Sequence, residues 1–183
     1  MNDTFIFGSA VKVSPVVYAK TGDQTKFKTY FPKGKWVSLA DYSKIVDSTG
    51  GFIELDMNQQ TVNAHLRPGS IIPIQQVDEK TTRTTADLIT KPTSILINRD
   101  AERSVSEGTV FLDGGESLSE LTGSKYEYYQ IQHKASKSIQ FQLKLGTRGS
   151  QDSRHFLESI VIANAEDLSE TDFACVFEND GSI

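Results

Sequence analysis

The sequence has little of the residue types that define several classes of proteins. It contains a single cysteine, Cys175, among its 183 residues. One cysteine excludes an intramolecular disulfide, so the fold must be stabilised by packing. Cys175 lies among apolar residues, including Phe173 and Phe177, which favours a small buried side chain over a reactive thiol.

The sequence also lacks an excess of positive charge and any long apolar run. The formal net charge is -5, and no basic stripe is visible, so nothing attracts the chain to phosphate backbones or anionic lipids. We therefore expect neither nucleic acid nor a membrane as a partner. No apolar stretch is long enough to span a bilayer, and residues 1–13 do not resemble a signal peptide. The localisation stays open.

Histidines are few and scattered. His65, His133 and His155 are the three in the chain, and they lie far apart in the sequence. This spacing does not match that of a zinc site, and no cofactor-binding motif is present. We expect no metal and no cofactor.

Apolar and polar residues alternate along several short segments. In segment 138–146, SIQFQLKLG, the apolar residues Ile139, Phe141 and Leu143 fall on one face. A period of two is typical of a half-buried strand in an antiparallel sheet. In segment 26–31, KFKTYF, the same period places alternate residues on one side. Further short strands are predicted at 93–98, 108–112 and 158–164.

Turn-forming glycines and prolines separate these segments at short intervals. Many short strands with frequent turns indicate β-sandwich architecture. Helical patterns are poor, and residues 164–172 offer at most a short exposed turn or helix. Long amphipathic segments, which a parallel α/β sheet needs for its crossovers, are absent. The polar, threonine-rich stretch 78–94 divides the chain. The fold class predicted is all-β, with two tandem antiparallel β-sandwich domains at 1–77 and 78–183.

Four segments, in this order, resemble one known family. They are FGSAVKVSPVV at 7–17, TYFPKGKW at 29–36, VNAHLRPGSIIPIQ at 62–75 and GTVFLDGGESL at 108–118. The pattern is similar to the C-terminal part of family 31 glycoside hydrolases, the α-glucosidases and their relatives. The resemblance implies a proximal (1–77) and a distal (78–183) sandwich that follow a catalytic (β/α)8 barrel. Residues 1–8 would then be the connection from the barrel.

The chain departs from the family pattern at two turns. The family's Arg-Gly-Gly is here Arg67-Pro68-Gly69, and its Asp-Asp-Gly is Asp113-Gly114-Gly115. Both changes fall at turns, so we expect the fold to tolerate them. A role that needs the missing aspartate is not expected here.

Carboxylates raise the question of catalysis, because retaining glycosidases need a nucleophile and an acid/base on either side of the bond. Asp56-Met57-Asn58 resembles the family's nucleophile motif, but barrel sites form at the ends of barrel strands, and none surrounds Asp56. The pair Asp113 and Glu116 fits a tight turn better than an acid/base pair. We therefore expect no catalytic residue in this chain.

His65 and Arg67 lie beside the Pro68-Gly69 turn, two residues apart, which places them on one face of a strand. Direct substrate contact and a domain interface are both open. Because the arginine fork can bind carbonyls or carboxylates of a neighbouring domain, we favour an interface, and the resemblance implies that this neighbour is the barrel.

Aromatic side chains are the remaining candidates for substrate binding. Trp36, Tyr126 and Tyr128 could stack on a sugar ring. Aromatic residues on strands more often pack across strands, so we expect Trp36 in the proximal core and treat all three as weak carbohydrate-binding candidates.

The sequence thus predicts a non-catalytic C-terminal region of an α-glucosidase-like enzyme, one that supports the catalytic barrel. By resemblance, the parent enzyme would hydrolyse terminal α-glucosidic bonds of oligosaccharides. The alternative is a free-standing module that binds carbohydrate or protein. If a barrel normally covers one face, an exposed apolar patch larger than a typical monomer shows is expected near residues 5–13.

Overall fold

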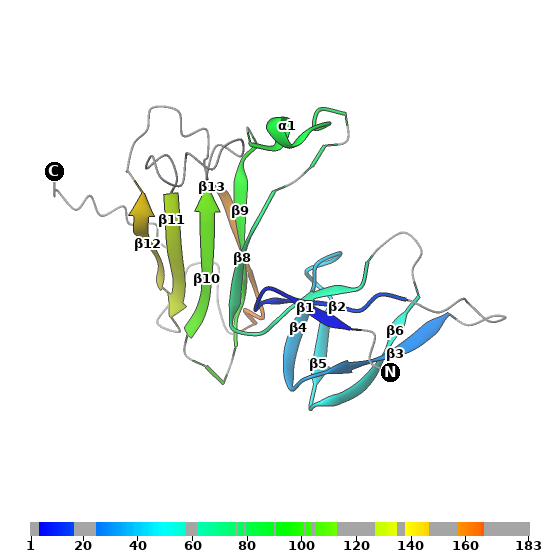
Figure 1. Ribbon diagram of the computed structural model, residues 1–183. Coiled ribbons are helices and arrows are strands. Elements are labelled where there is room, and N and C mark those ends of the chain that lie inside the picture. The colour runs from blue at the N-terminus through cyan, green and yellow to red at the C-terminus, as the bar shows by residue number, and fades with distance from the viewer. Residues whose placement is uncertain are drawn as a thin grey trace.

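The computed structural model describes eleven stretches of the chain in enough detail for analysis. These are residues 4–16, 25–57, 62–75, 77–78, 80–89, 91–100, 102–103, 105–112, 127–134, 138–146 and 157–166. They form two lobes built from strands (Figure 1). The all-β fold class predicted from the sequence is confirmed.

The first lobe contains two sheets. Five strands form one sheet in the order β1-β2-β7-β4-β5, and β3 pairs with β6 in a separate two-stranded sheet. All these pairings are antiparallel. The strands are β1 (Phe5–Phe7), β2 (Val11–Val13), β3 (Lys26–Phe31), β4 (Gly34–Ser38), β5 (Ile45–Ser48), β6 (Gly51–Asp56) and β7 (Ala64–Leu66).

The second lobe is a six-stranded sheet in the order β12-β11-β10-β8-β9-β13. A short helix, α1 (Thr85–Ile89), lies between β8 and β9 in the sequence. The strands are β8 (Ser70–Ile74), β9 (Thr93–Asn98), β10 (Val105–Leu112), β11 (Glu127–Lys134), β12 (Ser138–Gly146) and β13 (Leu157–Ala163).

Two pairings in this sheet are parallel, which the alternating pattern did not predict. Strand β10 runs parallel to β8, and β13 runs parallel to β9. The first follows from connectivity. The chain reverses between β9 and β10, and β8 is antiparallel to β9, so β10 must run in the direction of β8.

The alternation of apolar and polar residues and the β-branched runs predicted the positions of these strands correctly. Segments 26–31, 93–98 and 138–146 are strands with the predicted bounds, and 108–112 and 158–164 fall largely within β10 and β13. Along β3, Thr29 and Phe31 are buried and Phe27 is partly buried, while the alternate residues are exposed. Helix α1 was missed, because the polar stretch that contains it has no apolar period.

The predicted division at residue 77 stays a prediction. Strand β8 ends before that position, and yet it pairs with β9 and β10 of the second lobe. The hydrogen-bonded sheet of this lobe therefore begins at Ser70. The Pro68-Gly69 turn marks the point where the chain leaves the first lobe.

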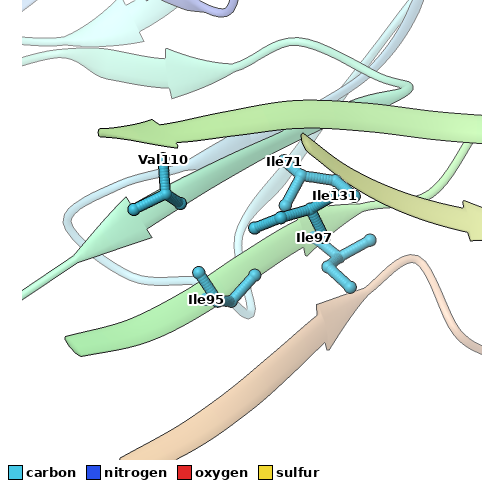
Figure 2. Packing of buried hydrophobic residues seen from close by; sticks show 5 residues of the cluster. All are labelled: Ile71, Ile95, Ile97, Val110 and Ile131. Carbon is cyan, nitrogen blue, oxygen red and sulfur yellow. The ribbon is translucent and has the colours of Figure 1, made fainter. Parts of the chain in front are cut away.

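The second lobe has an apolar cluster on one face of its sheet, the distal core. Figure 2 shows its five buried members reaching toward one another from four strands; they are Ile71, Ile95, Ile97, Val110 and Ile131. At about 1.5–3 kcal/mol for each buried large aliphatic side chain, this cluster is a main source of stability for the lobe.

A second cluster, the lobe seam, joins the two lobes. Val37 and Leu66 come from β4 and β7, and Leu96 and Ala163 come from β9 and β13. Strand β9 is buried at every position because its even-numbered side chain Leu96 enters the lobe seam while its odd-numbered neighbours enter the distal core. The lobes are therefore packed against one another through a shared apolar core.

Candidate functional site

The turn at Arg67-Pro68-Gly69 connects the two lobes, and its backbone conformation and close contacts restrict which residues fit there. Gly69 has φ of 74°, which favours glycine. Gly34, with φ of 130°, lies under the proline ring, and a Cβ at Gly34 would be 2.6 Å from Cγ of Pro68. Pro68, which departs from the family pattern, therefore packs where only a glycine at position 34, at the start of β4, leaves room for its ring.

The structure places His65 and Arg67 in different surroundings. His65 is buried between the sheets of the first lobe, where its ring meets Phe31 edge to face with centroids 5.1 Å apart. Arg67 is exposed beyond the end of β7, and its backbone N–H donates to the carbonyl of Ala10 at 2.8 Å. Their assignment to a domain interface stays a prediction, and only Arg67 has the exposure that a direct contact would need.

An amide clamp, formed by Asn98 and Asn164, holds the two lobes together beside the lobe seam. Asn98 is fully buried. Its Nδ2 donates to the carbonyls of Lys35 in β4 and Leu66 in β7, both at 2.9 Å. Its Oδ1 accepts a hydrogen bond from Nδ2 of Asn164, just after β13. One side chain of the second lobe thus satisfies two carbonyls of the first.

The residue Asn164 adopts a backbone conformation that supports this clamp. Its φ is 55°, in the left-handed region that asparagine tolerates better than most residues. Arg99 donates from Nη1 to its carbonyl at 3.3 Å. At the rim, exposed ion pairs join Lys33 to Glu102 and Lys35 to Glu166 across the lobes, at 2.7 Å and 3.7 Å; such exposed pairs contribute little.

A buried polar cluster lies inside the first lobe, between its two sheets. Lys12 in β2 is 1% exposed. Its Nζ donates to the hydroxyls of Ser14 and Thr29 and lies 4.0 Å from the centre of the Phe31 ring. His65 is the register partner of Lys12 on the neighbouring strand β7, so the two side chains share the face that β3 covers.

Burial governs the electrostatics of this cluster. Removal from water lowers the pKa of Lys12 to about 8, because a charged ammonium loses its hydration there. Burial, together with the nearby charge of Lys12, lowers the pKa of His65 to about 4. No carboxylate among the described residues forms an ion pair with Lys12, and Nδ1 of His65 is buried without a hydrogen-bond partner.

The contact of a lysine of lowered pKa with a serine hydroxyl has the composition of a Ser–Lys nucleophile pair. Its surroundings do not suit catalysis. Lys12 and Ser14 are each 1% exposed, and the hydroxyl of Thr29 also donates to Oγ of Ser14 at 3.2 Å. The ammonium, the two hydroxyls and the Phe31 ring satisfy one another, so the cluster is a closed packing arrangement.

The carboxylate candidates do not gain support from the fold. Asp56 is exposed at the end of β6, on the outward face that also carries the Lys28–Glu54 ion pair. Asp113 and Glu116 lie outside the described residues. Within the described stretches no group of three or more histidine, cysteine, aspartate and glutamate side chains could hold a metal.

The aromatic candidates differ in accessibility. Trp36 is 2% exposed and donates from Nε1 to the carbonyl of Pro32 at 3.0 Å, which confirms its predicted place in the proximal core and leaves no ring face for a sugar. Tyr128 is partly buried in β11 opposite Phe111, and Phe111 is 46% exposed. Tyr126 lies outside the described residues.

Strand β1 carries exposed apolar side chains at the place where the sequence predicted a large apolar patch; the size of the patch stays a prediction. It is the edge strand of its sheet, and its three side chains Phe5, Ile6 and Phe7 are 54%, 49% and 73% exposed. Successive side chains of a strand point to opposite faces, so apolar surface lies open on both faces of this edge. None of the helices that the structure describes is long and apolar enough to cross a membrane.

The buried polar cluster and the amide clamp were missed from the sequence. Lys12 alternates with apolar Val11 and Val13, which reads as an exposed position on a half-buried strand. Asn98 ends an apolar run, where an asparagine is typical of a turn. The one local signal that could have pointed to the cluster is a lysine between two valines, in a segment that continues directly into Ser14-Pro15.

Comparisons with known proteins fit this architecture. The sequence model of the glycosyl hydrolase family 31 C-terminal domain matches residues 1–72. An α-glucosidase of Hordeum vulgare is 37% identical over 114 residues, which cover 62% of this chain and 12% of that protein. A lysosomal α-glucosidase of Bos taurus is 29% identical over 135 residues, covering 66% and 14%. The chain thus spans about an eighth of the length of these relatives.

Solved structures show the same fold over more of the chain. The glucosidase II alpha subunit superposes with a TM-score of 0.73 at 16% identity, covering 88% of this chain and 18% of that one. A family 31 dextranase of Flavobacterium johnsoniae gives 0.56 at 23% identity, covering 74% and 16%. The sequence match, the relatives and the shared fold agree: residues 1–72 match the glycosyl hydrolase family 31 C-terminal domain, and the chain shares its fold with part of a family 31 dextranase.

Proposed function

We propose that this chain is the non-catalytic C-terminal β-sandwich region of an α-glucosidase-like enzyme, and that it supports a (β/α)8 catalytic barrel. The parent enzyme would hydrolyse terminal α-glucosidic bonds of oligosaccharides. The similarity to much longer α-glucosidases supports this proposal, because the segment that matches this chain makes up only 12% and 14% of their lengths.

The exposed apolar edge at β1 carries the proposal. Phe7 is 73% exposed, and it lies beside two further large apolar side chains that are about half exposed. Exposed apolar residues clustered in this way mark surfaces that another protein covers. An edge strand also offers unpaired backbone groups to a neighbour. A barrel covering β1 would bury the apolar side chains and cap the edge.

Two further assignments belong to this proposal. Residues 1–77 would form the proximal sandwich, with 1–8 as the connection from the barrel, and 78–183 would form the distal sandwich, with β8 added to its sheet. His65 and Arg67 would lie at the side facing the barrel. The exposure of Arg67 beside the turn supports a contact made by its guanidinium, whereas His65 would act by holding β7 in place.

The experiment measures docking in trans. The Hordeum vulgare α-glucosidase, truncated before the segment that matches this chain, is passed over the immobilised full chain. We expect binding by the wild-type chain and a loss of at least tenfold in affinity for the double variant Phe5→Ser/Phe7→Ser, because about 100–200 Å² of apolar surface would no longer be buried.

The matched control is Phe52→Ser, which removes an aromatic ring that is 63% exposed on β6, in a different sheet from β1. It should bind as the wild type does. Equal binding by the wild type and the β1 variant would contradict docking through this edge, and so would an equal loss of binding in the Phe52 variant.

A second candidate is a free-standing carbohydrate-binding module, favoured by one observation. Tyr128 and Phe111 are cross-strand partners on the face of the second sheet opposite the distal core, and Phe111 is 46% exposed. Aromatic side chains of this kind can stack on sugars. Titration of maltose into the labelled chain would move the amide resonances of β10 and β11 if this candidate is right, and would leave them in place if it is wrong.

A further inference from the structure

The buried polar cluster of the first lobe carries an inference that is independent of any barrel. We propose that Lys12 and His65 form an acid-sensitive lock that holds the β3–β6 sheet against the sheet containing β2 and β7. With His65 neutral the lock is closed; protonation of His65 places a second positive charge beside Lys12 and releases β3. The proposal rests on four features of the cluster.

First, the two groups are neighbours by strand register. Lys12 and His65 are paired residues of the antiparallel strands β2 and β7, so their Cβ atoms lie about 4.5–5.5 Å apart. Both side chains contact the same ring, because Lys12 Nζ lies 4.0 Å from the centre of Phe31 and the His65 ring meets Phe31 edge to face. A charge gained by one is therefore felt by the other.

Second, none of the described residues places a negative charge beside the pair. The residues of β3 that cover it are Thr29 and Phe31, and the residue of β4 in register with His65 is Ser38. The carboxylates of β6, Glu54 and Asp56, are exposed on the outer face. Lys12 is the charge that acts on His65, and it repels a proton there.

Third, the imidazole is buried with unused bonding capacity. His65 is 3% exposed, and its Nδ1 has no hydrogen-bond partner within the part of the chain that the structure describes. A proton on this atom would be a buried donor without an acceptor, which adds a desolvation cost to the repulsion. Protonation of His65 therefore destabilises the closed arrangement.

Fourth, β3 is the strand that we expect to detach from the larger sheet when the lock opens. It pairs only with β6 among the described strands, and the side chains that anchor it to the larger sheet are those touching the polar pair. Phe31 also packs edge to face on Trp36 of β4, with centroids 5.8 Å apart. Loss of the cluster would leave β3 and β6 attached through the Phe31–Trp36 contact and the hydrogen bond that Ser48 Oγ of β5 donates to the carbonyl of Phe31 at 3.0 Å.

The sign of the pH effect follows from proton binding. The pKa of His65 in the folded chain, about 4, lies below its ordinary value of 6.5. As the pH falls below 6.5, His65 binds a proton in the opened state, whereas in the closed state it stays neutral until the pH approaches 4. The stabilisation is thus complete above pH 6.5 and is lost progressively down to about pH 4, by about tenfold in the opening equilibrium per pH unit.

The test is hydrogen exchange of the full chain, read as protection factors at pH 7, 6 and 5. In the wild type we expect the protection of β3 and β6 amides to fall about tenfold between pH 6 and pH 5. The variant His65→Phe keeps a ring against Phe31 but cannot take up a proton, so its protection should not fall. Unchanged protection in the wild type, or the same fall in His65→Phe, would overturn the proposal.

A second variant covers the case in which His65→Phe does not fold. Lys12→Met removes the neighbouring charge and keeps an apolar side chain of similar length. The midpoint of the His65 ring titration, followed by NMR, should then move upward toward the ordinary histidine value. An unmoved midpoint would refute the coupling. His133, in β11 of the other lobe, also has a pKa lowered by burial, so β10 and β11 amides are scored separately.

Discussion

Truncation of Asn98 is the perturbation that best tests how the lobes are joined. Asn98→Ala removes three hydrogen bonds: two from Nδ2 to the carbonyls of Lys35 and Leu66, and one that Asn164 donates to Oδ1. Each bond contributes about 1 kcal/mol, and buried groups left without partners add to the cost. We therefore expect the free energy of unfolding to fall by about 3–5 kcal/mol.

Urea unfolding measures this loss with one probe in each part of the molecule. Trp36 is the only tryptophan, so its fluorescence reports the first lobe, and far-UV circular dichroism reports strands in both. With a slope of about 2 kcal/mol per molar urea, the midpoint should fall by about 1.5–2.5 M. Because the clamp joins the lobes, both probes should shift.

The matched control is Asn63→Ala. Nδ2 of Asn63 also donates to a backbone carbonyl, that of Asp56 at 3.2 Å, but in an exposed setting. Water can replace this bond, so the cost should stay below about 1 kcal/mol. If Asn98→Ala costs no more than Asn63→Ala, the clamp does not hold the lobes and the reasoning from buried amide bonds is refuted.

Two further variants test close packing and buried charge. A Cβ at Gly108 would lie 2.1 Å from the carbonyl oxygen of Ile71, so Gly108→Ala should lower the free energy of unfolding in urea by more than about 3 kcal/mol. The control Gly51→Ala, where a Cβ would meet nothing within 4 Å, should change it by less than about 1 kcal/mol. Equal effects would contradict the β8–β10 register. Lys12→Met should raise the free energy of unfolding at pH 7 by about 1–3 kcal/mol, because burial lowers the pKa of the lysine from 10.5 to about 8. The wild type should gain stability as the pH rises from 8 to 10.5, and the variant should not. A parallel gain in both would refute the lowered pKa of Lys12.

The strands were predictable from the sequence because each has a local cause. Segment 26–31 alternates, and its buried face is the one that the period of two selects. Segment 93–98 is a short β-branched run, as expected for a strand buried on both faces, and that is where the structure places it. Local side-chain periodicity therefore determined the positions of these elements.

The pairing of the strands and the polar interior were not predictable in the same way. The addition of β8 to the second sheet depends on contacts of Ser70–Ile74 with distant strands. Lys12 and Asn98 are polar residues in strands, and only the fold shows that both are buried. Their partners lie many residues away, at Thr29 and Leu66, so no local pattern records them.

The family resemblance contributed what periodicity could not. The four ordered segments led to the same family as the matched domain at residues 1–72. Exposed apolar side chains, expected near residues 5–13, are present at β1. The interface roles of His65 and Arg67 remain predictions, because on our proposal the surface that would meet them belongs to the catalytic barrel.

The central claim is that this chain braces a catalytic domain and cleaves no bond itself. The most direct measurement is turnover of a chromogenic α-glucoside by three samples: the chain alone, a truncated Hordeum vulgare α-glucosidase alone, and the two mixed. We expect no turnover by the chain alone and a longer half-life of activity on heating for the mixture than for the truncated enzyme. Turnover by the chain alone that Asp56→Asn abolishes would contradict it.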